Sequence, residues 1–390
     1  MSNNLTILNT IKTKFTEQFK TKPTFYHAPG RINLIGEHTD YNDGYVLPAA
    51  IDKAMYFAVS KNDLNKLRLF SIDYNSFLEI EVSELRKTTT HWANYLIGVA
   101  AQFQRKGLKI GGIDCVFGGD IPLGAGLSSS AALECGFAFC LNEQFKLGVK
   151  KLQLILMAQK AEHDFAGVQC GIMDQFVSMF GKDGHVVRLD CRSLDFDYFP
   201  LTNDVVDVIL CDTKVKHSLA SSEYNIRRRE CEKGVAIIKE NHPEVKSLRD
   251  VSVQMMEESR TGMPYNIYQR CHYVVHEIIR VEKACTALIN CDFNTFGKLM
   301  YETHDGLSLE YNVSCKELDV LVNIARKDSN VLGSRMMGGG FGGCTINLIK
   351  KGGAEKFIQT VISEYPKLTG MQTEIYRVKI SDGVNKVDFS

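Results

Sequence analysis

The chain has 390 residues, of which 46 are basic and 46 acidic, so its formal net charge is zero. This length can bury a substantial core and favours two domains over one. A neutral chain is not expected to present a broad binding surface to nucleic acid or anionic lipid, so any anion site must be local.

Helical and strand-like patterns alternate through the first half of the chain. Hydrophobic periodicity and turn residues predict each of these elements. In chain order they are a helix at 4–20, a short strand at 24–28, strand-like runs within 45–60, a helix at 93–106, a strand at 113–117 and a helix at 129–146.

The second half begins after a strand-rich patch at 184–212. We place the domain boundary inside this patch, which gives an N-terminal domain at 1–200 and a C-terminal domain at 201–390. Beyond it, apolar residues recur at three- and four-residue steps from Ile267 to Leu288. That spacing predicts one long amphipathic helix whose apolar stripe packs into the core. Periodicity alone therefore predicts mixed α and β structure.

Composition also indicates the cellular compartment. The opening residues lack the basic stretch and apolar run of a secretory signal, and no later segment is apolar for long enough to span a bilayer. The 12 cysteines form no C-x-x-C pair, and most lie in apolar runs. They are expected to be reduced and buried, with zinc binding or a disulfide framework as the minor alternative. We expect a cytoplasmic protein that binds neither nucleic acid nor membrane.

Residues 29–51 carry polar side chains more densely than a core segment tolerates without a ligand. Many donors and acceptors beside a turn-forming backbone suit a small, hydroxyl-rich molecule. The segment therefore favours a sugar-binding loop, and a solvated turn after a strand is the alternative. Its polar members are Arg31, Asn33, Glu37, His38, Asp40, Asn42 and Asp43.

A second segment, Pro122 to Glu134, is rich in glycine and serine and runs directly into a helical pattern. Glycines permit tight turns that expose backbone N–H groups, and serine hydroxyls add donors at a helix start, where the dipole favours anions. These features suit a triphosphate. The segment is not a Walker A loop, because G-x-x-x-x-G-K-[ST] does not occur. For the loop alone, an ordinary serine-capped helix is the alternative.

A third glycine cluster, Gly338 to Gly343, satisfies G-x-G-x-x-G but lies in the wrong context for a dinucleotide fingerprint. The strand pattern follows it, from Cys344, whereas the fingerprint must follow a strand and open a helix. We interpret it as a turn between two strands that makes room for a ligand or a neighbouring domain. Protein-kinase signatures are also missing, since neither His-Arg-Asp nor Asp-Phe-Gly occurs.

Taken together and in this order, the three segments resemble the galactokinase family of the GHMP small-molecule kinase superfamily. The resemblance implies an α/β architecture of two domains with mixed and antiparallel sheets, and an active site in the cleft between them. The matching segments are the signature at 30–45, the phosphate loop at 124–132, the third motif at 337–343 and further stretches at 161–163, 170–176, 221–231 and 311–319.

The activity that this resemblance implies is transfer of the γ-phosphoryl group of ATP, with Mg²⁺, to the anomeric hydroxyl of α-D-galactose. Asp174 would be the catalytic carboxylate and Arg31 its partner. An aspartate with an ordinary pKa of about 3.9 is ionised at neutral pH and can accept the hydroxyl proton. An arginine beside it offsets its repulsion of the phosphates. Proton removal and simple orientation of the hydroxyl both stay open, and a helix N-cap is the alternative for Asp174.

The remaining site residues are carried over from the same resemblance. The sugar would be held by Glu37, His38, Asp40 and Tyr224, with the backbone of Gly171 nearby. ATP would be held by Gly124, Ala125, Gly126, Leu127, Ser128, Ser129, Ser130, Ala131 and Trp92. Ser130 and Glu162 would be the Mg²⁺ ligands, since Mg²⁺ prefers hard oxygen donors. The alternatives are a structural role for His38, a solvated charge at Glu162 and a core position for Trp92. We expect Arg227, Arg228 and Arg229 to form a solvated face, with phosphate contact by one of them as the alternative.

Two other functions stay open for a chain of this family. Some relatives phosphorylate N-acetylgalactosamine or other sugars, and residues 29–45 do not exclude a bulkier C2 substituent. Other relatives are sensors that bind galactose and ATP without turnover, and they lack part of the serine-alanine segment. Ser130, Ala131 and Asp174 are all present here, which favours an active kinase. The sequence leaves the oligomeric state open, with a monomer favoured.

Overall fold

The computed structural model describes residues 2–122, 124–202, 204–215 and 220–389. Its α-helices are α1 (Ser2–Phe19), α2 (His91–Arg105), α3 (Ser129–Phe145), α4 (Lys151–Ala161), α5 (Met173–Phe180), α6 (Ala220–Lys239), α7 (Val253–Glu258), α8 (Tyr265–Ile289), α9 (Phe293–Asp305), α10 (Lys316–Lys327) and α11 (Ala354–Thr369). Its strands are β1 (Thr24–Asn33), β2 (Tyr45–Val46), β3 (Pro48–Asn62), β4 (Lys66–Ser71), β5 (Ser76–Glu81), β6 (Gly112–Gly119), β7 (His185–Asp190), β8 (Phe196–Pro200), β9 (Val206–Asp212), β10 (Val331–Met336), β11 (Cys344–Lys350), β12 (Glu374–Val378) and β13 (Asn385–Val387).

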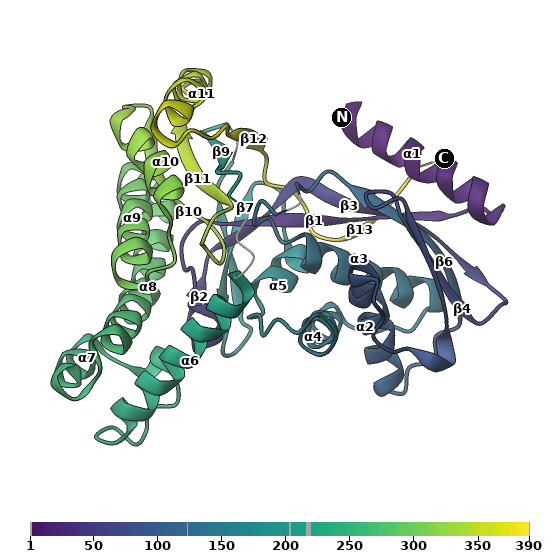
Figure 1. Cartoon of the computed structure of the whole chain (residues 1–390), viewed down its shortest axis with the longest axis horizontal. Helices are drawn as coiled ribbons and strands as arrows, with labels where there is room; N and C mark the ends of the chain where they lie inside the picture. The colour runs from purple at the N-terminus through teal and green to yellow at the C-terminus, as the bar shows by residue number, and fades with distance from the viewer. Residues whose placement is uncertain (1, 123, 203, 216–219, 390) are drawn as a thin grey trace.

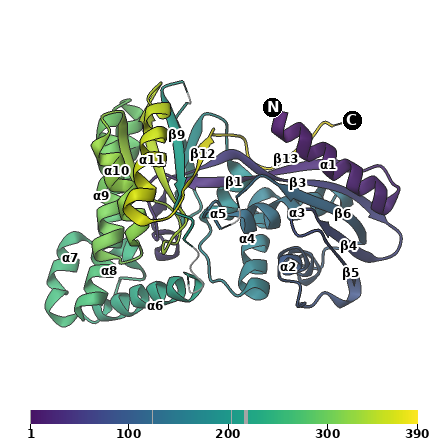
Figure 2. The ribbon, with the colours of Figure 1, turned by 45° about the horizontal axis from the view of Figure 1, so that its top comes forward.

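A six-stranded sheet with the order β13-β1-β3-β6-β4-β5 organises the first half of the chain. All its strand pairs are antiparallel except β4 with β6. Helix α1 covers one face, and α2 to α5 gather on the other (Figures 1 and 2). Alternation along β3 explains this arrangement, because Tyr56 joins the core beneath α1 while Phe57 joins the core on the side of α3.

A four-stranded antiparallel sheet, β10-β11-β9-β12, organises the second half. Helices α8 to α11 stand beside it, and the long α8 carries the predicted apolar stripe into the core (Figure 1). After β12 the chain returns to the first sheet, where β13 pairs with β1 at the sheet edge and Val387 lies opposite Phe25. A small third sheet, with the order β2-β7-β8, contacts β3 of the first sheet and helix α8.

The predicted mixed α/β class is confirmed, and each element predicted from periodicity corresponds to one in the structure. The strand predicted at 24–28 is longer, because β1 continues through a register break to Asn33. The division at residue 200 falls between β8 and β9 and stays a prediction. The 12 cysteines are free, and most of them are buried. No helix in the described part of the chain has the length and apolar character that crossing a membrane requires.

Candidate active site

Arg31 and Asp174 form a two-point ion pair at the centre of the site. Arg31 lies near the end of β1, and Asp174 lies in the first turn of α5. The Nε and Nη2 atoms of Arg31 each donate to a different oxygen of Asp174 at 2.8 Å. The Ser128 hydroxyl also donates to Asp174, and Nη1 of Arg31 donates to the carbonyl of Gly126 at 2.5 Å. The carboxylate of Asp174 is therefore bound by Arg31 and Ser128. Asp174 is not the N-cap of α5, because Ile172 occupies that position.

A cavity of about 170 Å³ opens beside this ion pair, and we call it the acceptor cavity. Every residue predicted to act in catalysis or sugar binding lines it, although they come from β1, the segment after it, the connection before α5, α5 itself and α6. Small concave cavities with a few convergent polar groups are typical ligand sites. These lining residues are Arg31, Glu37, His38, Asp40, Gly171, Asp174 and Tyr224.

Asp40 and Gly171 are in close contact in the wall of the acceptor cavity. A Cβ atom at Gly171 would stand 1.7 Å from Oδ2 of Asp40, so only glycine fits there. Burial, and then the charge of Asp174, raise the pKa of Asp40 to about 7. Near neutral pH this carboxyl group can therefore exchange a proton as its surroundings change.

His38 is a buried, neutral imidazole in the same wall. Burial lowers its pKa to about 4, and its backbone is left-handed, with φ at 62°. Its Nδ1 is 2.8 Å from the hydroxyl of Tyr41, which is 2.7 Å from the hydroxyl of Tyr311. The Tyr224 ring centroid lies 5.5 Å from that of His38. This chain of hydrogen bonds and ring contacts fixes the imidazole against the cavity.

A second cavity of about 250 Å³, which we call the phosphate cavity, lies against the glycine- and serine-rich loop. Ser128 adopts a left-handed backbone immediately before α3, which turns the loop into the helix. Arg31, Gly338 and Gly339 line both cavities, so the two lie side by side. Ala125 and Ala131, also predicted to hold ATP, are buried and do not line this cavity. The predicted phosphate-loop residues that line the cavity are Gly124, Gly126, Leu127, Ser128, Ser129 and Ser130.

The predicted metal ligands Ser130 and Glu162 are hydrogen-bonded neighbours. Glu162 is buried, so its interpretation as a solvated charge is wrong, and burial raises its pKa. One of its oxygens accepts from the amide of Gln175 at 2.7 Å and from the thiol of Cys170 at 3.2 Å. Glu162 also opens the π-helical turn η3 (Glu162–Ala166), a feature frequent at functional sites.

The donor set of this pair fits Mg²⁺. A hydroxyl and a carboxylate are hard oxygen ligands, and Mg²⁺ is usually held by one or two carboxylates together with waters and phosphate oxygens. In the described ranges no group of three or more His, Cys, Asp or Glu side chains is placed to hold a metal ion. Ser130 and Glu162 would supply two ligands, and phosphate oxygens and waters would supply the others.

Trp92 lines neither of these two cavities. It is buried near the start of α2, with its ring centroid 5.4 Å from that of Phe117. Its predicted place near the adenine stays a prediction. The solvated face expected for the arginine run is wrong at Arg227, which is buried and donates to the carbonyls of Tyr311 and Asn312.

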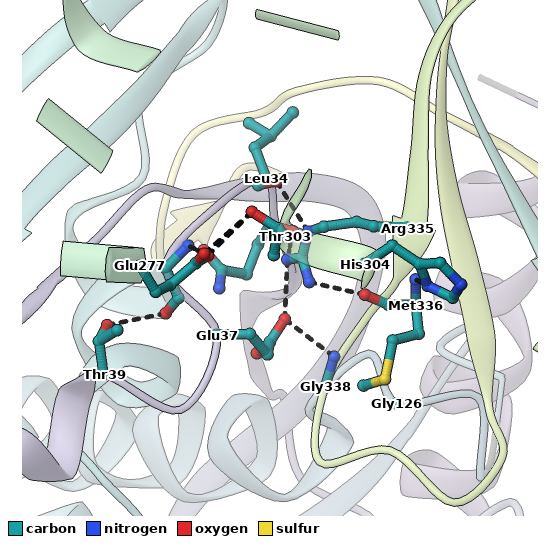
Figure 3. A network of polar contacts seen from close by, with 12 residues as sticks. Leu34, Glu37, Thr39, Gly126, Glu277, Thr303, His304, Arg335, Met336 and Gly338 are labelled. Carbon is teal, nitrogen blue, oxygen red and sulfur yellow. Dashed lines mark hydrogen bonds and ion pairs between the residues drawn. The ribbon is translucent and has the colours of Figure 1, made fainter. Parts of the chain in front are cut away.

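Two buried ionic residues that sequence patterns did not single out hold the sugar-binding loop from opposite sides (Figure 3). Arg335 donates to the carboxylate of Glu37 at 2.7 Å, and Glu277 accepts from the backbone N–H of Gly36 at 2.7 Å. Both side chains are fully buried. The sequence signal available was a charged residue within an apolar strand, for Arg335, and beside the apolar stripe of an amphipathic helix, for Glu277. Neither signal identifies the partner.

Three family models match the chain, in an order that follows the three sequence segments. They are the galactokinase galactose-binding signature at residues 13–61, the GHMP kinases N terminal domain at 94–182 and the GHMP kinases C terminal domain at 285–367. The galactokinase of Thermotoga petrophila is 41% identical over 361 residues, which cover 92% of this chain and 99% of that protein. The galactokinase of a Roseiflexus species is 38% identical over 378 residues, covering 97% of this chain and 96% of that protein.

Solved structures give the same result. A Lactococcus lactis galactokinase complexed with galactose matches with a TM-score of 0.94 and 32% identity, covering 98% of this chain and 100% of that chain. The mevalonate kinase of Methanococcus jannaschii matches with a TM-score of 0.65 and 14% identity, covering 93% of this chain and 100% of that chain. The second match shows a shared fold alone.

Proposed function

Because the chain belongs to the galactokinase family of the GHMP kinases, it is a sugar kinase, and we propose that it transfers the γ-phosphoryl group of ATP to the C1 hydroxyl of α-D-galactose. The products are galactose 1-phosphate and ADP. In this reaction the C1 oxygen forms a bond to the γ-phosphorus, the bond from that phosphorus to the bridging oxygen of ADP breaks, and the hydroxyl proton leaves.

The observation that carries the proposal is the position of the ion pair between Arg31 and Asp174 at the junction of the two cavities. Phosphoryl transfer requires an acceptor oxygen and a phosphate held in line, with the charge on the transferring group offset. Asp174 would receive or orient the hydroxyl proton on the acceptor side. Arg31, which lines both cavities, would offset negative charge as the phosphoryl group passes between them.

The acceptor cavity supplies the groups that recognise the sugar. Glu37, Asp40 and the hydroxyl of Tyr224 would bind ring hydroxyls, and His38 would offer its neutral imidazole. A hydroxyl that is missing or inverted leaves such buried groups unpaired, which costs about 1–3 kcal/mol for each. This penalty gives the basis for choosing galactose over a sugar that differs at one carbon.

Ser130, which lines the phosphate cavity, and Glu162, which lines the acceptor cavity, would hold Mg²⁺, and the ion would offset negative charge on the phosphates of ATP. The glycine- and serine-rich loop would hold those phosphates through its N–H and hydroxyl donors. The cytoplasmic location, the monomeric state, the division at residue 200 and the lack of nucleic-acid or membrane binding are also proposals. These rest on the sequence.

Release of ADP tests the function directly. Purified protein is incubated with ATP, Mg²⁺ and, in turn, galactose, N-acetylgalactosamine, glucose, arabinose and mevalonate. Turnover selective for galactose supports the proposal. Selectivity for another sugar would support the proposed phosphoryl transfer but show that galactose is not the substrate. Galactose binding without turnover of any compound would indicate a sensor.

A further inference from the structure

Arg335, at the end of β10, has a fully buried charged side chain. Its Nε donates to the carbonyl of Leu34 at 2.8 Å, and its Nη1 donates to the carbonyl of Met336 at 2.6 Å. Its Nη2 donates to the carbonyl of Asn33 and, at 2.7 Å, to Oε2 of Glu37 (Figure 3). One planar side chain therefore joins the end of β10, which immediately precedes the third motif, to the end of β1 and to the carboxylate of Glu37.

The two carboxylate oxygens of Glu37 have different surroundings. Its Oε2 accepts both from Arg335 and from the backbone N–H of Gly338, at 3.1 Å. In the described part of the chain no donor binds its Oε1, and Glu37 lines the acceptor cavity. A carboxylate accepts on both oxygens, so a Glu37 held through Oε2 presents Oε1 to a ligand in one fixed orientation.

The loop that carries Glu37 is also held from the opposite side. Glu277 in α8 accepts from the N–H of Gly36 at 2.7 Å and from the hydroxyl of Thr303. The backbone around residue 36 is therefore fixed independently of Arg335. A change at Arg335 would be expected to act on the Glu37 carboxylate more than on the path of the loop.

We propose that Arg335 is a positioning residue that fixes the Glu37 carboxylate for recognition of one sugar hydroxyl. The proposal rests on the proposed sugar-kinase function. It requires the guanidinium in particular, since three of the four acceptors lie within residues 33–37 and the fourth is the carbonyl of Met336, and a planar fork of donors reaches them together. A lysine keeps the charge but offers one compact ammonium group, which cannot hold all of them in place.

The test compares sugars that each lack one hydroxyl. For the wild-type protein, kcat/KM is measured with galactose and with its 2-, 3-, 4- and 6-deoxy derivatives, which gives a discrimination ratio for each hydroxyl. The Glu37→Gln variant identifies the hydroxyl whose ratio depends on Glu37. Arg335→Lys is expected to lower the ratio at that same hydroxyl by on the order of tenfold or more, because small misplacements of a binding group are costly. The other ratios and the KM for ATP stay unchanged.

The matched control is Arg270→Lys. Arg270 is also buried and also donates to a backbone carbonyl, that of Glu310, but the carboxylate it pairs with is that of Glu230, which does not line the acceptor cavity. It should leave all the ratios unchanged. Thermal unfolding checks that each variant is folded. If Arg335→Lys does not fold, Arg335→Gln is measured in its place.

Four results would overturn the proposal. Loss of kcat/KM by one common factor for every sugar, or ratios equal to those of the wild type, would assign Arg335 a purely structural role. Failure of both Arg335 variants to fold beside a folded Arg270→Lys would do the same. A Glu37→Gln variant with wild-type ratios would mean that Glu37 recognises no hydroxyl. A wild-type protein that phosphorylates none of the sugars would instead refute the proposed function.

Discussion

Arg31 and Asp174 make the same two-point contact as a second pair, Arg68 and Asp114, which lies in the first sheet. In each pair Nε and Nη2 donate to the two oxygens of one carboxylate, at 2.8 Å in the first and at 2.7 and 2.6 Å in the second. Only the first pair lines the acceptor cavity. Substitutions in the second pair therefore measure what such a contact contributes to folding, and substitutions in the first pair measure in addition what it contributes to the reaction.

Replacing Asp174 with Asn should reduce kcat by on the order of a thousandfold, since proton transfer by a positioned group contributes roughly that much. The amide keeps the size of the side chain, so galactose binding measured by calorimetry should persist. Asp114→Asn is the control. It should lower the free energy of unfolding by about 2 kcal/mol, because it weakens the charge-assisted hydrogen bonds between buried Asp114 and partly exposed Arg68, while kcat stays at the wild-type value. Comparable turnover in Asp174→Asn would remove Asp174 from catalysis.

Gly171→Ala should raise the KM for galactose by on the order of a hundredfold, because displacement of a binding group by about 1 Å has that effect. The new methyl group would meet Oδ2 of Asp40 at 1.7 Å and displace this carboxylate from its place in the wall of the acceptor cavity. Gly262→Ala is the control, since a Cβ there has no atom within 4 Å. Steady-state kinetics with galactose and with ATP would distinguish the two substrates. An unchanged KM for galactose would mean that Asp40 does not contact the sugar.

The sequence predicted the parts of the site that lie in short, dense motifs. Arg31, Glu37, His38 and Asp40 belong to one run, and turn geometry brings them to one cavity. Asp174 required the family resemblance, because one acidic residue near a helix start has no local pattern that marks it as catalytic.

Long-range partners were beyond the reach of sequence patterns. Arg335 lies in a strand whose other residues are apolar or small, and its contact with Glu37 spans 298 positions. Hydrophobic periodicity does not indicate which buried acidic residue will pair with a buried basic residue. The position of Trp92 is a related case, since an aromatic residue at a helix start suits both a core and a nucleotide site, and here it packs on Phe117.

Glu162→Gln should raise the Mg²⁺ concentration required for half-maximal activity by on the order of tenfold or more, because loss of a metal-site contact has that effect. The amide removes a negative charge that would face the metal. Asp164→Asn is the matched control, since Asp164 lies on the same π-helical turn but pairs with Arg105 and Lys160 near the surface. Binding of Mn²⁺, followed by electron paramagnetic resonance, gives a measurement independent of turnover. An identical metal titration for Glu162→Gln and wild type would exclude Glu162 from the site.

The affinity for galactose should increase as the pH rises from 5.5 to about 7 and then become constant. The reason is the pKa of Asp40, which burial and the charge of Asp174 raise to about 7, so that only above this value is the carboxylate ready to accept from a sugar hydroxyl. Calorimetry in two buffers of different ionisation enthalpy should therefore detect proton release on binding below pH 7.

The stability of the ligand-free protein should change with pH in the opposite direction through the same group. A carboxyl whose pKa is raised on folding binds more protons in the folded state than in the unfolded state between pH 3.8 and about 7. Its contribution to the free energy of unfolding therefore falls as the pH rises through this window, by at most about 1.4 kcal/mol per pH unit. Asp40→Asn should flatten both profiles, whereas Asp43→Asn, at an exposed position in the same loop, should leave both as in the wild type. A galactose affinity independent of pH in the wild-type protein would show that Asp40 does not bind the sugar as a carboxylate.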